Sequence, residues 1–157
     1  MATPSPTTAL QNEHATMTVL LDLLKQEQEY LVSADTEALE QATPAKTDMV
    51  RQMAAATSER HQALSAAGFP GSDKGMESWL AANGDERAAS LWNALIELTR
   101  EAKEQNRVNG MLIARHLAHN QNLLNAMRQP ASGPESAVYG PSGQAPSTGP
   151  SRRFVLG

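Results

Sequence analysis

Residues 86–129 contain no proline, and their apolar and small side chains recur at three- and four-residue steps. This spacing places them on one face of an α-helix, and Asp85 is suited to cap its first turn. At 1.5 Å per residue such a helix would be roughly 65 Å long. Because that length exceeds the diameter of a small globular domain, other helices must lie along it, or part of it must await a partner.

A first helix is predicted over residues 9–32, where apolar side chains recur at alternating four- and three-residue steps. Thr8 and Gln11 have the spacing of a capping box at its start. The preceding residues 1–8 are rich in proline, serine and threonine, which predicts a flexible arm.

A second helix is predicted over residues 36–67, with Asp35 as its N-cap and Gly68 at its end. Pro44 lies inside this segment, so the helix should kink there or start afresh. Residues 74–82 are expected to form a short connector helix that packs its apolar side on the bundle.

The sequence therefore predicts an all-α fold, an elongated antiparallel bundle or hairpin of three main helices plus the connector helix. Aromatic residues make up only 4% of the chain, so leucine, alanine and methionine must supply most of the core. One helical domain is expected over residues 9–129. Residues 130–157 are a flexible tail by composition, since 15 of the 28 are proline, glycine or serine.

Charge and cysteine content exclude several classes of protein. Residues 1–104 carry 8 basic and 16 acidic side chains, whereas residues 105–157 carry 5 basic and 1 acidic. The basic excess is too dispersed for a nucleic-acid surface. No secretory signal and no membrane-spanning segment are visible. The absence of cysteine suits a cytoplasmic protein and excludes thiolate metal sites and cysteine nucleophiles.

Catalytic and metal-binding patterns are weak throughout the chain. His116 and His119 are three residues apart on the long helix, but residues 105–129 contain no aspartate or glutamate to complete a metal site. There is no glycine-rich phosphate loop and no nucleophile elbow. We therefore expect no enzyme activity, no cofactor and no metal.

The second half of the long helix combines amide and apolar side chains on one face. That face can be an ordinary helix–helix contact in which Gly110 allows close approach. It can also be a surface for another protein's amphipathic helix, whose register the amides would fix. With an aromatic residue from the tail added, the candidate partner-binding residues are Asn106, Asn109, Gly110, Ile113, Leu117, Asn120, Leu123, Leu124, Met127 and Tyr139.

Two motifs resemble those of the FlgN family of flagellar chaperones. The run from Asn106 to Ile113 is similar to that family's Asn-x-x-Asn-Gly-x-x-Ile signature. The segment Tyr139-Gly140-Pro141-Ser142-Gly143 resembles its Tyr-Gly-Pro-Asp-Gly element, with serine where aspartate is common. The leucines and Glu27 of the first helix, Lys46, and Trp79 in the connector also fit. The resemblance covers roughly residues 10–143.

The resemblance implies a cytosolic chaperone of the flagellar type III export pathway. Such a protein would bind the helical terminal segment of hook-associated junction proteins, prevent their premature assembly, and deliver them to the export gate and ATPase components. Tyr139 is expected to dock either on the chaperone's own helices or on the export gate. Which junction protein is carried, and whether the chaperone forms oligomers, stays open.

Two alternatives remain at this stage. A bundle that associates with itself through the long helix would serve as a scaffold, although Gln28, Asn109 and Asn120 interrupt the apolar seam that a strict coiled coil needs. A metal-binding helical enzyme is the third possibility, and it has only the two neighbouring histidines in its favour.

Overall fold

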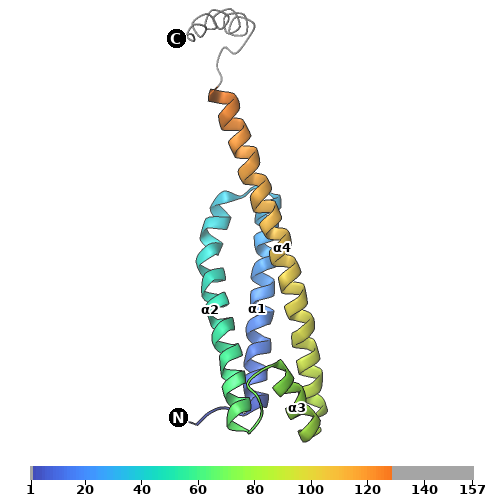
Figure 1. Cartoon of the computed structure of the whole chain (residues 1–157). Helices are drawn as coiled ribbons and strands as arrows, with labels where there is room; N and C mark the ends of the chain where they lie inside the picture. The colour runs from blue at the N-terminus through green and yellow to red at the C-terminus, as the bar shows by residue number, and fades with distance from the viewer. Residues whose placement is uncertain (1, 129–157) are drawn as a thin grey trace, which may run out of the picture. The chain divides into compact units, whose positions relative to one another are not determined.

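The computed structural model describes residues 2–128 of the chain, and these form four helices (Figure 1). They are α1 (Pro6–Val32), α2 (Thr36–Ala66), α3 (Asp73–Asn83) and α4 (Glu86–Arg128). The prediction of an all-α fold is confirmed. The predicted tail, residues 130–157, lies outside the described residues.

The chain divides into two units, residues 1–114 and residues 115–157. We call them the bundle unit and the C-terminal unit, and α4 contributes residues to both. In the bundle unit α1 and α2 run antiparallel, and α3 lies near the start of α4 (Figure 1).

The first helix begins three residues earlier than predicted. Ser5, not Thr8, is the N-cap: its hydroxyl accepts a hydrogen bond from the Thr8 backbone N–H at 3.1 Å. Pro6 occupies the first helical position, where its fixed φ favours the helix and its missing N–H costs nothing. The predicted arm therefore ends at Ser5, and the proposed capping box at Thr8 is wrong.

The second helix passes through Pro44 without a new start. Proline removes the hydrogen bond to the carbonyl four residues earlier, which belongs to Glu40. Both residues are exposed, so water can satisfy that carbonyl. The helix ends at Ala66, one residue before the predicted end, and Gly68 follows with a left-handed φ of 88°.

Two of the helices begin with an aspartate N-cap, as predicted. Asp35 accepts from the Ala38 N–H at 3.1 Å. Asp85 accepts from the Arg87 N–H at 3.0 Å and from the Ala88 N–H at 3.3 Å. These side chains satisfy backbone donors that have no partner inside the helix.

The core lies among all four helices of the bundle unit, and α1 contributes most to it. By contrast, α2 buries side chains only from Ala56 onward. The connector helix packs Met76 and Trp79 inward, as expected. The buried cluster is Leu10, Met17, Leu20, Leu21, Leu24, Leu64, Met76, Trp79, Ala88, Trp92, Leu95 and Ala102.

Among residues 2–128, no helix combines the length and the apolar character needed to cross a membrane.

Two glycines differ sharply in their surroundings and make a matched test of the fold. A Cβ on Gly75 would lie 1.7 Å from the Pro70 carbonyl oxygen, whereas one on Gly110 would meet nothing within 4 Å. We expect Gly75→Ala to lower the free energy of unfolding by about 3 kcal/mol, because the backbone at Pro70 would have to move away from the new methyl group. Gly110→Ala should raise it by roughly 0.5–1 kcal/mol, since alanine is the better helix former. Urea unfolding followed by circular dichroism measures both, and an unchanged Gly75→Ala protein would contradict the close packing of this turn.

Candidate functional site

Asn109, a residue of the family-like signature, is buried inside the bundle unit with 1% of its surface exposed. Its amide nitrogen donates to the Leu24 carbonyl oxygen and to Glu27 Oε1, both at 2.8 Å. Its Oδ1 accepts from Gln105 Nε2 at 3.2 Å. The expectation that Asn109 faces a partner is therefore wrong: its hydrogen bonds are used to hold α4 against α1.

The carboxylate that receives Asn109 also binds α2. Lys46 Nζ donates to both oxygens of Glu27 at 3.0 Å. One buried carboxylate of α1 thus joins the three long helices within the bundle unit. Burying a charge is tolerable only when its hydrogen bonds are met, and here a lysine and an asparagine meet them.

The other predicted residues of the bundle unit are accessible. Asn106, Gly110 and Ile113 are exposed. No atom lies within 4 Å of where a Gly110 Cβ would be, so this glycine does not serve the close approach of a neighbouring helix.

In the C-terminal unit, described over residues 115–128, large apolar side chains face outward. Leu117 is 63% exposed and Met127 79% exposed, and Leu123 and Leu124 are each about half exposed. Leu117, Leu124 and Met127 lie on one face with the exposed Asn120, at steps of three and four residues. We call Leu117, Leu123, Leu124 and Met127 the apolar stripe.

An apolar stripe of this size is unusual on a free surface. Scattered apolar residues are normal there, whereas a contiguous group usually marks an interaction site. The amides around the stripe can donate and accept hydrogen bonds, which suits recognition of a peptide. Tyr139, the remaining predicted partner residue, lies outside the described residues.

His116 and His119 of α4 belong to no metal-binding group among the described residues. Within residues 2–128, no group of three or more histidine, aspartate or glutamate side chains is placed to hold an ion. His119 is exposed and His116 is half-buried.

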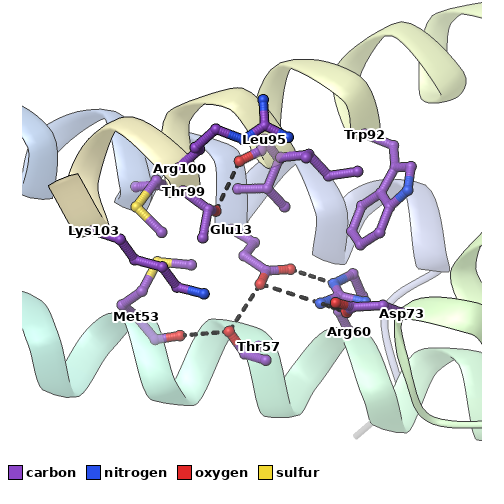
Figure 2. A pocket seen from close by; sticks show the side chains of 12 residues that line it. Glu13, Met53, Thr57, Arg60, Asp73, Trp92, Leu95, Thr99, Arg100 and Lys103 are labelled. Carbon is purple, nitrogen blue, oxygen red and sulfur yellow. Dashed lines mark hydrogen bonds and ion pairs between the residues drawn. The ribbon is translucent and has the colours of Figure 1, made fainter.

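A cavity of about 460 Å³ in the bundle unit was not foreseen from the sequence (Figure 2). All four helices or their ends contribute to it. Its lining residues are Glu13, Met17, Met53, Thr57, Arg60, Asp73, Trp92, Leu95, Ile96, Thr99, Arg100 and Lys103. No periodicity marks these residues together, since they come from separate helices.

Glu13 and Arg60 form a buried ion pair at the floor of this cavity. Arg60 Nε donates to Glu13 Oε2, and Thr57 Oγ1 donates to Glu13 Oε1 at 2.8 Å. The guanidinium carbon of Arg60 lies 4.7 Å from the ring centre of Trp92, a cation–π distance. Because the carboxylate is already bound by these donors, the arrangement suits binding more than proton transfer.

The role of Asn109 can be tested against a neighbour on the same helix. Asn109→Ala leaves the Leu24 carbonyl without its amide donor and Glu27 with one donor fewer, so unfolding should become easier by about 1–3 kcal/mol. Asn106→Ala removes an exposed amide and should change stability by less than about 0.5 kcal/mol. Thermal and urea unfolding compare the two proteins. Equal stabilities would mean that the amide does not hold α4 in place.

Comparison with known proteins identifies the family. The FlgN family model, described as FlgN protein, matches residues 1–147. Over 57 residues the chain is 37% identical to Flagella synthesis protein FlgN of Proteus mirabilis. That match spans 36% of this chain and 37% of the relative. No solved structure gives a significant match. Because the family model covers nearly the whole chain, the protein belongs to the FlgN family.

Proposed function

We propose that this protein acts in flagellar biogenesis as a cytosolic export chaperone, which binds the helical terminal segment of hook-associated junction proteins. The observation that carries the proposal is the apolar stripe of the C-terminal unit. Family membership and the name of the Proteus relative support the flagellar role. The chaperone prevents premature assembly of its cargo and delivers it to the export gate and ATPase components.

The stripe has the chemistry that an amphipathic helix requires. Leu117, Leu124 and Met127 provide apolar surface at helical spacing, so the apolar face of a second helix can cover them. Burial contributes roughly 25 cal/mol per Å² of apolar surface removed from water. The amides of Asn120, together with those of its neighbours, fix the register of the bound helix through hydrogen bonds.

The charge of the C-terminal unit also favours a cargo helix as the bound partner. The described part of the C-terminal unit carries Arg115 and Arg128 and no aspartate or glutamate. An acidic or neutral helix therefore meets no like charge there. A cargo segment that folds only on binding loses ordering entropy, on the order of 2–5 kcal/mol. That cost keeps the complex weak enough for release at the gate.

The proposed chemistry is binding without catalysis. The cavity of the bundle unit is lined by neither histidine nor cysteine. Its carboxylate Glu13 is held by Arg60 and Thr57. The chaperone therefore works by covering and releasing a segment of its cargo.

A self-associating scaffold is the second candidate, because a second copy of the chain can also cover the apolar stripe. The two candidates differ in the mass of the isolated protein. The scaffold requires a stable oligomer in the absence of cargo, whereas the chaperone requires a complex with a junction protein. Light scattering coupled to size-exclusion chromatography measures the mass of the isolated protein and the mass of its complex with a junction protein.

Substitution of two stripe residues by aspartate tests whether the apolar stripe binds cargo. We expect Leu117→Asp with Leu124→Asp to weaken binding of a recombinant hook-associated junction protein at least a hundredfold in titration calorimetry. Charged groups cannot enter an apolar contact without losing hydration. The melting temperature of the bundle should stay unchanged, since both side chains are exposed.

The matched control introduces the same two charges on the other face of the same helix. Ala118→Asp with Asn122→Asp, both at exposed positions, should bind cargo within about threefold of the wild type. If the stripe variant and this control bind cargo equally well, the apolar stripe is not part of the cargo-binding surface.

Tyr139 provides a separate test of delivery. Aromatic side chains are common anchors of interfaces, and the resemblance places this residue in the family's tail element. We expect Tyr139→Ala to lower binding of purified export-gate protein at least tenfold while cargo affinity stays the same. Surface plasmon resonance with immobilised gate protein measures the first quantity. If neither affinity changes, Tyr139 has no part in delivery.

A further inference from the structure

The cavity of the bundle unit contains a buried cationic group with an unused donor. Arg60 is 3% exposed, and its Nε and Nη2 donate to Glu13 and Asp73. Its Nη1 is buried and has no hydrogen-bond partner among the described residues. Leaving a buried donor without an acceptor is unfavourable, because the donor has lost its hydrogen bonds to water. Buried polar groups in folded proteins are almost always paired, so this donor can take a further acceptor.

A second cation lines the same cavity without a partner. Lys103 forms no ion pair with any of residues 2–128. Figure 2 shows its side chain extending from α4 into the cavity, on the side of Met53 and Thr57.

The other basic residues on this stretch of α4 are already paired. Arg100 pairs with Glu97, and Arg107 pairs with Glu104 at 2.7 Å. The hydrogen bond from Arg107 lowers the pKa of the Glu104 carboxyl. Lys103 is therefore the basic residue of this stretch whose charge is available to a ligand.

The remaining walls of the cavity are largely apolar. Met17, Met53, Trp92, Leu95 and Ile96 contribute to them. Its volume of about 460 Å³ falls within the range of roughly 300–1,000 Å³ typical of ligand pockets, which combine apolar walls with a few placed polar groups. A matching occupant has a carboxylate beside one or two apolar side chains.

We propose that this cavity binds a segment of the cargo protein in which an aspartate or glutamate stands beside bulky apolar residues. The carboxylate accepts from Arg60 Nη1 and pairs with Lys103, and the apolar side chains pack against Met53 and Trp92. Glu13 and Asp73 at the same site disfavour a polyanion such as nucleic acid, because several phosphates would meet both carboxylates. The inference rests on the proposed function, since it names cargo as the source of the segment.

Charge reversal at Lys103 provides the test. The full-length chaperone is titrated with a recombinant hook-associated junction protein, and affinities are measured by calorimetry. We expect Lys103→Glu to weaken binding about tenfold or more, the loss expected when a charge-assisted contact is removed. Lys103→Arg keeps the charge and should bind within about threefold of the wild type. Lys74→Glu makes the same charge change at an exposed residue outside the cavity lining and should have no effect beyond twofold.

A charge exchange identifies the carboxylate of the cargo. Acidic residues of the cargo's terminal segments are changed singly to lysine and titrated against Lys103→Glu. The residue that enters the cavity should restore at least half of the lost binding energy. Circular dichroism and thermal unfolding confirm that every chaperone variant has the wild-type fold.

The outcomes separate this inference from the proposed function. If Lys103→Glu binds like Lys74→Glu and the wild type, the cavity does not bind the cargo segment, and the inference is wrong while the chaperone function stands. If Lys103→Glu and Lys74→Glu weaken binding equally, the effect is one of net charge, and the inference is wrong. If the wild type itself binds no junction protein, the proposed function fails and the inference fails with it.

Discussion

Two buried carboxylates on α1 set the register of the bundle. Glu13 pairs with Arg60 and Glu27 pairs with Lys46, so both partners come from α2. The pairs are 14 residues apart on each helix, and a single antiparallel register therefore satisfies both. A slip by one turn would leave two charges buried without partners, which costs several kcal/mol for each. The leucine-rich core alone would not penalise such a slip as strongly, because aliphatic side chains pack in many arrangements.

The same two carboxylates bring α4 into place. Glu27 accepts from Asn109, and Arg60, held by Glu13, lies over the ring of Trp92. Each ion pair between α1 and α2 therefore also contacts a side chain of α4, which is Asn109 in one case and Trp92 in the other. Polar contacts of this kind contribute more to the choice of one arrangement than to net stability. The side chains of Glu13, Arg60 and Trp92, which line the cavity, are consequently held in one arrangement.

Much of the fold followed from local patterns in the sequence, because helix periodicity and capping are local properties. Asp35 and Asp85 cap the helices as predicted. The Ser5-Pro6 start was missed, although proline at a first helical position is a known signal. The sequence left open whether Asn109 lies in a helix–helix contact or faces a partner, since its burial depends on Glu27 more than 80 residues away. The cavity escaped prediction for the same reason. The candidate residues between Leu117 and Met127 are exposed, and whether they bind cargo stays a prediction.

The burial of Asn109 has a consequence for genetics. Under the proposed function, substitutions of Asn109 that destabilise the bundle will be recovered in screens for lost motility alongside substitutions that weaken cargo binding. The two groups can be told apart by temperature. Alleles at Asn109 should be conditional, permissive in the cold and restrictive when warm, because the hydrogen bonds they remove matter most near the unfolding transition. Under the proposed function, alleles in the apolar stripe should be defective at every growth temperature, and only these should be rescued by compensating changes in the cargo gene.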